Sequence, residues 1–294
     1  MIRTAAVAAV AALLATGLGA VPPAAATEPA SCAAQRTPAS FRACMATATR
    51  VYVDQWTTAL SARGVTAAPP SVRIFAAAPA NACVDPTLGD VAVASFWCDK
   101  DATIYFSAFA APFWTRTYAR EARRAGVLAS DAARLRRTEQ RLLRGHANQG
   151  AATELAHELG HWVQEQAGLA DWYERRMAPQ TARAGRYQSA YELASDCMAG
   201  WVQGRAAAAG AWRDTAFIDW ASHATIAELG ADMTGMRPGF RFPRDVPLIG
   251  HGGPFSRLRL YDAGVALGRS GADGVGGCAR AAATFTRTTA PPGT

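Results

Sequence analysis

Hydrophobic positions between residues 41 and 63 recur at mostly helical spacing, and Gly64 follows them directly. Apolar residues that return every three or four positions are typical of an amphipathic helix, and a glycine after such a run is a frequent helix stop. We therefore predict a helix over 41–63. Residues 27–40 are rich in proline, alanine and threonine, which indicates a mobile lead-in to this helix.

Three later segments are rich in β-branched and aromatic residues, and a Pro69-Pro70 turn signal precedes the first of them. The segments cover 71–76, 91–97 and 102–106. Short runs of this composition between turn residues predict strands. We expect the three strands to form a small antiparallel sheet.

The pattern turns helical after Pro112 and stays so for most of the remaining chain. The predicted helices cover 113–125, 130–144, 149–167, 190–209, 212–229 and 256–267. Gly168 and Gly210 mark the ends of two of them. Strands followed by a run of helices predict the α+β class, with the small sheet packed on a mostly helical body.

The first 26 residues have the pattern of a secretory signal peptide. Arg3 precedes a mostly apolar stretch over 4–20, a proline pair follows it, and three alanines end at Ala26. The apolar stretch is shorter than the roughly 18 residues that a membrane span needs. We expect cleavage near Ala26 and a secreted, extracellular protein with no stable membrane insertion.

Composition and charge restrict the classes of protein that the chain can belong to. Half of the residues are hydrophobic, which is enough for a substantial core and argues against disorder. The formal net charge is +7, and Lys100 is the only lysine among 30 basic residues. Together with the heavy use of alanine, this excess of arginine indicates compositional bias. A nucleic-acid partner is not expected, because export would separate the protein from it.

The six cysteines are an even number, which suits disulfide pairing in an oxidising compartment. None has C-x-x-C spacing, so a structural zinc knuckle is the weaker explanation. Spacing alone leaves the connectivity open. Proximity along the chain favours Cys32–Cys44 and Cys83–Cys98, which leaves Cys197–Cys278.

The segment from His157 to His161 reads His-Glu-Leu-Gly-His. Residues four apart on a helix share a face, so both imidazoles can reach one ion. Imidazole nitrogen suits zinc, and a catalytic zinc takes three protein ligands and leaves a position for water. Glu158 can then accept the proton that this water releases. The motif predicts a zinc enzyme with Glu158 as its general base.

Glu192 and Asp196 are also four residues apart, on a predicted helix about 30 residues beyond His161. One helix would supply two imidazoles and the other a carboxylate as third ligand. Asp196 would lie one turn from Glu192, where it can accept the second N–H of a ligand histidine. A solvated acidic pair is the simpler explanation of these two residues taken alone.

Three blocks of sequence carry a resemblance to a known family. The block from His157 to Gln164 is similar to its H-E-x-G-H-x-V-Q pattern, and the block from Glu192 to Gly200 to E-L-x-A-D-C-x-A-G. A looser third block begins with His251-Gly252 and ends with Arg257. The chain thus resembles the bacterial family of putative neutral zinc metallopeptidases, a zincin group. The resemblance covers about residues 71–285.

The blocks depart from the family pattern at a few positions. Ser195 stands where alanine is usual, and Gly253 and Ser256 replace expected polar residues after His251. The first change is small. The other two leave the role of the His251 loop open.

The resemblance implies His157, His161 and Glu192 as ligands of one Zn²⁺ per chain, with Glu158 as general base. It implies a hydrolase, a metalloprotease that cleaves peptide or protein substrates internally. It also favours Glu192 over Asp196 as third ligand, and zinc bound by Asp196 with Glu192 outside is the alternative.

An oxyanion forms during peptide hydrolysis, and one donor besides zinc should stabilise it. His251 is the first candidate for this catalytic role, followed by Tyr187 or Tyr191. His146 and His223 lack such a context and are expected to be structural or exposed.

The expected domains are a signal peptide over 1–26, a lead-in and helix over 27–70, and the zinc metallopeptidase domain over 71–294. The middle segment is open to interpretation as a propeptide, a docking segment or part of the fold. In zincins an extended substrate lies along an edge strand beside the metal helix. The predicted strand over 102–106 is the nearest candidate.

Two competing functions remain open. Nine arginines against three acids between Arg116 and Arg144 could contact anionic polymers or lipid headgroups, as in a catalytically inactive, zinc-containing binding protein of the cell envelope. An ordinary solvated helix face is the simpler explanation of these arginines. The second possibility is an enzyme that keeps zinc and has lost substrate access. Glu158 favours catalysis, since a structural zinc site needs no acid beside its first ligand.

Overall fold

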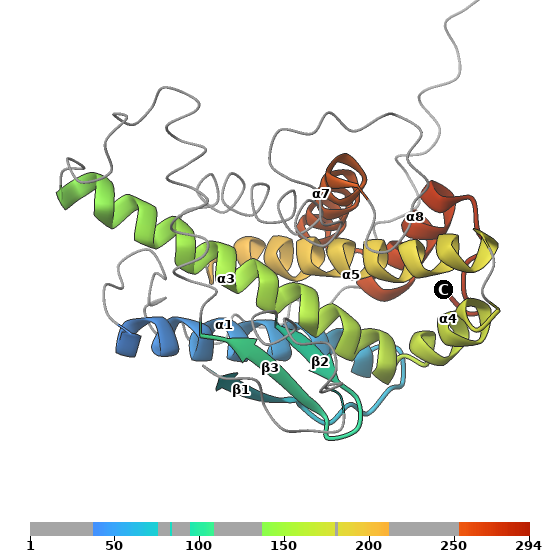
Figure 1. The fold of residues 1–294 in the computed structure, drawn as a ribbon, viewed down its shortest axis with the longest axis horizontal. Helices are drawn as coiled ribbons and strands as arrows, with labels where there is room; N and C mark the ends of the chain where they lie inside the picture. The colour runs from blue at the N-terminus through green and yellow to red at the C-terminus, as the bar shows by residue number, and fades with distance from the viewer. Residues whose placement is uncertain (1–37, 76–82, 84–94, 109–136, 180–181, 212–252) are drawn as a thin grey trace, which may run out of the picture.

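The computed structural model describes residues 38–75, 83, 95–108, 137–179, 182–211 and 253–294. Its elements, in chain order, are α1 (Pro38–Ser61), β1 (Ser71–Phe75), β2 (Phe96–Cys98), β3 (Thr103–Ser107), α3 (Arg137–Gln166), α4 (Leu169–Met177), α5 (Ala182–Ala208), α7 (Pro254–Ser270) and α8 (Gly274–Thr286). A small sheet packs on a mostly helical body (Figure 1), which confirms the predicted α+β class. The predicted helices over 113–125 and 212–229 lie outside the described residues.

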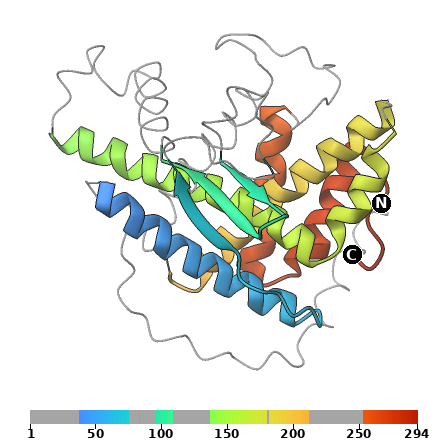
Figure 2. The same cartoon turned by 60° about the horizontal axis from the view of Figure 1, so that its bottom comes forward.

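The sheet has the strand order β1-β3-β2. β2 pairs with β3 antiparallel, with Trp97 opposite Ile104, but β1 pairs with β3 in parallel, with Ser71 opposite Thr103. The prediction of an antiparallel sheet was therefore wrong for β1. A parallel pair needs a long connection, and here the chain between β1 and β3 includes β2, which takes the other edge. Figure 2 shows the sheet in front of the helices.

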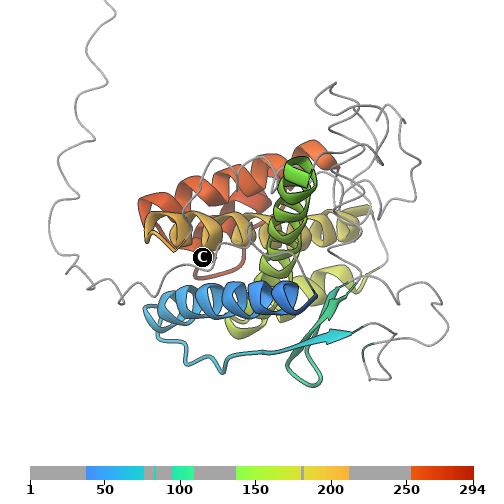
Figure 3. The ribbon, with the colours of Figure 1, turned by 90° about the vertical axis from the view of Figure 1, so that its left-hand side faces the viewer.

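Helix α1 is part of the main core. It begins at Pro38 and ends at Ser61, and Gly64 after it has φ 77°, a left-handed conformation that glycine adopts freely. Its buried Trp56 stacks on Trp201 of α5 with ring centroids 4.3 Å apart. Figure 3 shows α1 and α7 on opposite sides of α5. The division into domains stays a prediction, but residues 41–60 of α1 pack in the same core as α3 and α5.

Two of the predicted disulfides are confirmed, Cys83–Cys98 and Cys197–Cys278. Cys44 is also disulfide-bonded, and Cys32, its predicted partner, lies outside the described residues. Disulfides persist in oxidising compartments, so these bonds fit an exported protein. Within the described residues, we find no helix with the length and apolar content that crossing a membrane requires.

Helices α5 and α7 are in direct backbone contact through glycines. A Cβ atom added at Gly264 would lie under 3.0 Å from the carbonyl oxygen of Cys197, and one at Gly200 equally close to that of Tyr261. Gly204 and Gly268, each one turn further along its helix, meet the opposite backbone in the same way. Only glycine permits this approach. The contact brings the first turn of α7 against α5.

A Gly264→Ala substitution should lower the free energy of unfolding by about 1–3 kcal/mol or more, because the new methyl group overlaps a rigid backbone carbonyl. Urea denaturation measures this change. Ala266→Leu adds more carbon atoms on the exposed side of the same helix and should stay within about 0.5 kcal/mol of the parent. Equal midpoints for all three proteins would contradict the backbone contact.

Candidate metal centre

Two packed helices present the chemically active side chains. His157 and His161 lie one turn apart on α3, and Glu192 and Asp196 lie one turn apart on α5. The helices approach closely at Gly160, where an added Cβ would lie 3.0 Å or less from several atoms of Ser195. The Ser195 hydroxyl also donates to the His157 carbonyl at 2.5 Å. Serine at this position therefore ties the two helices together.

The structure brings His157, His161 and Glu192 into one buried cluster that could hold a metal ion. The two Nε2 atoms are 3.2 Å apart, and Glu192 Oε2 lies 3.4 Å from His157 Nε2 and 3.5 Å from His161 Nε2. All three residues are at least nine-tenths buried. The prediction that residues four apart share one helix face thus agrees with the geometry of each pair.

The other ring nitrogens fix how both histidines face the cluster. His157 Nδ1 lies 2.9 Å from Asp196 Oδ1, and His161 Nδ1 lies 2.9 Å from Gln164 Oε1. Gln164 donates its amide N–H to the Tyr191 carbonyl at 2.8 Å, which leaves its oxygen toward His161. In the neutral imidazoles, which metal binding requires, Nδ1 is then the donor in each ring and Nε2 turns a lone pair to the cluster.

The spacing of the three atoms fits zinc. Tetrahedral zinc has bonds of about 2.0–2.2 Å to nitrogen and oxygen, which places neighbouring ligand atoms about 3.3–3.5 Å apart. The observed separations are 3.2, 3.4 and 3.5 Å. Two imidazoles and one carboxylate are also a donor set typical of catalytic zinc.

The cluster attracts positive charge. Burial alone would lower the pKa of His157, but hydrogen bonds with Asp196 and Glu192 outweigh it and raise the pKa to about 10. Three electron-pair donors in a buried space therefore favour a cation among them, which is the condition for binding a divalent metal ion.

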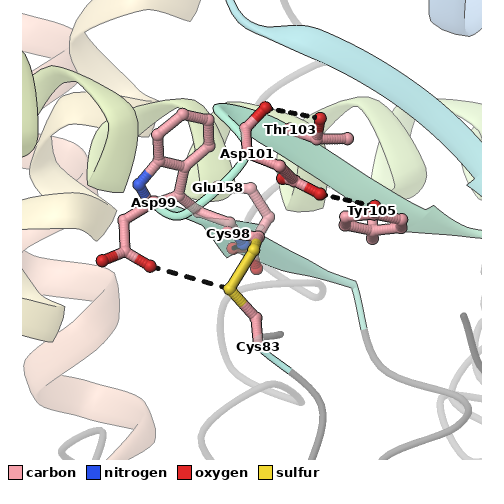
Figure 4. Close-up of a disulfide and its surroundings, with 8 residues drawn as sticks. Cys83, Cys98, Asp99, Asp101, Thr103, Tyr105 and Glu158 are labelled. Carbon is pink, nitrogen blue, oxygen red and sulfur yellow. Dashed lines mark hydrogen bonds between the residues drawn. A yellow bond between two sulfur atoms is a disulfide. The ribbon is translucent and has the colours of Figure 1, made fainter. Parts of the chain in front are cut away.

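Glu158 lies beside the cluster and is held by the sheet. Its Oε2 accepts the backbone N–H of Trp97 at 3.0 Å. Burial raises the pKa of this carboxyl to about 7, against the opposing effect of His157 and His161. Figure 4 shows Glu158 next to the Cys83–Cys98 disulfide at the end of β2. A carboxyl with a pKa near neutrality is suited to exchanging protons.

A second carboxylate on α3 holds the same strand segment. The Ser95 hydroxyl donates to Glu154 Oε1 at 2.5 Å and accepts the N–H of Ser107 at 3.1 Å. Ser95 and Trp97 are two residues apart in extended chain, and Glu154 and Glu158 are one helical turn apart. Both spacings are about 6–7 Å, so two carboxylates of the helix can bind two positions of the extended segment at once.

Arg257, in the first turn of α7, completes the surroundings of Asp196. Its Nε and Nη2 donate to the two oxygens of Asp196 at 2.7 and 2.6 Å, and both side chains are fully buried. Burial raises the pKa of Asp196, but the charge of Arg257 and the His157 contact outweigh it and lower the pKa overall. Asp196 is thus kept as a carboxylate. The third sequence block ended at Arg257, but spacing alone assigned it no role.

The structure describes two of the three residues predicted to stabilise the oxyanion. His251 lies outside the described residues, so its role stays a prediction. The Tyr191 ring stacks on His161 with centroids 4.7 Å apart, whereas the Tyr187 hydroxyl bonds Thr289. Of the two tyrosines, Tyr191 is the one in contact with the cluster.

The remaining sequence predictions concern two histidines and one strand. His223 lies outside the described residues, and His146 is on α3 but its side chain is not described. The predicted substrate strand over 102–106 is wrong, because it forms the central strand β3. Both sides of β3 are already paired, and within the described residues β2 is the edge strand in contact with α3.

Comparison with known proteins agrees with the cluster. Residues 128–271 match the family model described as Putative neutral zinc metallopeptidase. This segment contains the cluster, Glu158, Asp196 and Arg257. The chain matches no curated protein and no solved structure.

Proposed function

We propose that this chain, whose residues 128–271 belong to the Putative neutral zinc metallopeptidase family, is an exported zinc-dependent endopeptidase. The observation that carries the proposal is the buried meeting of three metal-binding atoms beside a carboxyl that binds none of them. Glu158 has no place in a purely structural site, whereas hydrolysis needs a proton acceptor there.

His157, His161 and Glu192 would hold one zinc ion per chain. The spacing of their three atoms supports this choice. Asp196 is the less suitable ligand, since both of its oxygens are engaged by Arg257 and one of them also by His157. Asp196 instead holds the imidazole of His157 with its Nε2 toward the ion.

Zinc in this position supplies Lewis acidity, which lowers the pKa of water and polarises the scissile carbonyl. Glu158 removes the proton from the attacking water and passes it to the leaving amine. The Trp97 N–H donates to Oε2 of Glu158, and this bond fixes the position of Oε1, the oxygen that accepts the proton. Arg257 keeps Asp196 ionised, so that His157 stays in the tautomer the ion requires.

An extended peptide or protein substrate would bind next to β2, the edge strand beside α3. Edge strands accept an added strand through backbone groups, and in β2 the Trp97 N–H is already engaged by Glu158. His251 or Tyr191 would then stabilise the oxyanion. No nucleic acid and no membrane takes part in this reaction.

Metal removal tests the proposal directly. Dialysis against a strong chelator should abolish hydrolysis of an unfolded protein such as casein, and one equivalent of zinc should restore it. A catalytically inactive binding protein would show no hydrolysis in either state. Casein hydrolysis that survives complete removal of zinc would disprove the proposal.

An Asp196→Ala substitution should weaken zinc binding by about 10–100-fold, because His157 loses the carboxylate that orients it. Competition with a chromophoric chelator measures the affinity. Asp54→Ala removes an exposed aspartate of α1 and serves as the control, with zinc affinity unchanged. Complete loss of zinc in Asp196→Ala would favour Asp196 as ligand.

A further inference from the structure

A hollow lies between the beginning of α5 and the chain that follows α8. Its volume is about 510 Å³, and none of the cluster residues lines it. The lining residues are Arg183, Arg186, Tyr187, Arg287, Thr288 and Thr289. Among these described residues, three carry guanidinium groups, three carry hydroxyls and none is acidic. The hollow is therefore positively charged and rich in hydrogen-bond donors.

The segment after α8, which forms one wall of the hollow, has a defined conformation and a hydrogen bond to α5. Arg287 ends α8 with φ 55° and ψ 44°, a left-handed conformation that few residues other than glycine adopt. This turn carries Thr288 and Thr289 back toward α5. The Thr289 hydroxyl then bonds the Tyr187 hydroxyl at 2.9 Å. The hollow is thus built by two segments about 100 residues apart in sequence, joined by a defined contact.

The Tyr187 hydroxyl in the wall is hydrogen-bonded to its neighbours. The pKa of Tyr187 is lowered, mainly by the hydrogen bond with Thr289 and, against the opposing effect of burial, by Arg183 and Arg176. Arginine does not lose its proton in proteins, so the guanidinium groups of Arg183, Arg186 and Arg287 in the lining stay positively charged. An anion in the hollow would be attracted by all three.

We propose that this hollow binds a phosphate-type oxyanion. A guanidinium group donates two parallel hydrogen bonds to a phosphate, and the tetrahedral oxygens of phosphate can face three such groups, which the two oxygens of a carboxylate cannot. The hydroxyls of Thr288 and Thr289 lie on the same wall, where they hydrogen-bond Thr286 and Tyr187, so the arginines are the donors left for the anion.

The size of the hollow bears on the source of the phosphate. Its volume of about 510 Å³ is within the range of roughly 300–1,000 Å³ typical of small-molecule sites. The site therefore has room for a phosphate carried on a small organic group as well as for inorganic phosphate. Neither source needs zinc, so this proposal is independent of the peptidase proposal.

Titration calorimetry on the zinc-loaded protein tests the site, with inorganic phosphate, glycerol 3-phosphate and acetate at equal ionic strength. Arg183→Gln and Arg186→Gln should each weaken phosphate binding by about 10–100-fold, the usual effect of losing a charged hydrogen bond. Both positions are exposed on a helix, and glutamine is a good helix former, so the fold should persist. Arg50→Gln makes the same charge change on α1 and should leave binding unchanged.

The two phosphate compounds separate the possible sources. Tighter binding of glycerol 3-phosphate would assign the site to an esterified phosphate, and equal or tighter binding of inorganic phosphate would assign it to the free ion. Three results would overturn the proposal: no binding up to about 10 mM, acetate binding as well as phosphate, or phosphate binding that is the same in the parent and both α5 variants. The last result would place any bound phosphate elsewhere, for example on the zinc.

Discussion

A Glu158→Gln variant is expected to keep one zinc ion per chain and to lose peptide hydrolysis by about 10²–10⁴-fold, the usual contribution of a general base. Glutamine has nearly the same shape and retains an oxygen that can accept the Trp97 N–H at 3.0 Å. It has no oxygen that takes up a proton at neutral pH. The measurements are zinc content by mass spectrometry and initial rates on casein or a quenched peptide.

The matched control for this variant is Glu165→Gln, an equal change at an exposed position of the same helix. It should retain both zinc and activity. Loss of zinc in Glu158→Gln would mean that Glu158 is a ligand. Full activity in Glu158→Gln would remove it from the reaction.

A Glu192→Ala variant should lose zinc affinity by more than about 100-fold, since it removes an atom that lies 3.4 and 3.5 Å from the two imidazole nitrogens. The effect should exceed that of Asp196→Ala, because losing a ligand costs more than losing the group that orients one. Hydrolysis should fall in parallel with zinc content and should not recover with stoichiometric zinc.

Glu174→Ala, at an exposed position on α4, controls for the loss of one carboxylate. The alternative ligand assignment predicts the opposite order, with zinc retained in Glu192→Ala and lost in Asp196→Ala. The two variants measured side by side therefore decide which carboxylate binds the ion.

The sequence predicted which residues meet at the site better than it predicted what surrounds them. His157 and His161, and then Glu192 and Asp196, each follow from the four-residue spacing of a helix face, which is a local property. Helical periodicity also located α1 within three residues, but α5 begins eight residues before its predicted start, and α3 is one helix where two were predicted over 130–144 and 149–167. Local geometry is what a single sequence encodes most directly.

What the sequence could not predict depends on how distant segments meet. The direction of β1 relative to β3 is invisible to alternation, because a strand has the same pattern read in either direction. The Trp97 N–H on Glu158 is a backbone contact across 61 residues and leaves no side-chain signature. Arg257 reaches Asp196 only once α7 has docked on α5.

The glycine contact between α5 and α7 has a consequence for the metal. Since the two backbones touch, the reach from Arg257 to Asp196 is set by the spacing of the helices. A single methyl group at Gly264, seven residues from Arg257, would widen that spacing and lengthen the two bonds to Asp196. His157 would then lose part of its support. Zinc affinity in such variants would therefore report how closely α5 and α7 approach each other, although none of the contact glycines touches the metal cluster.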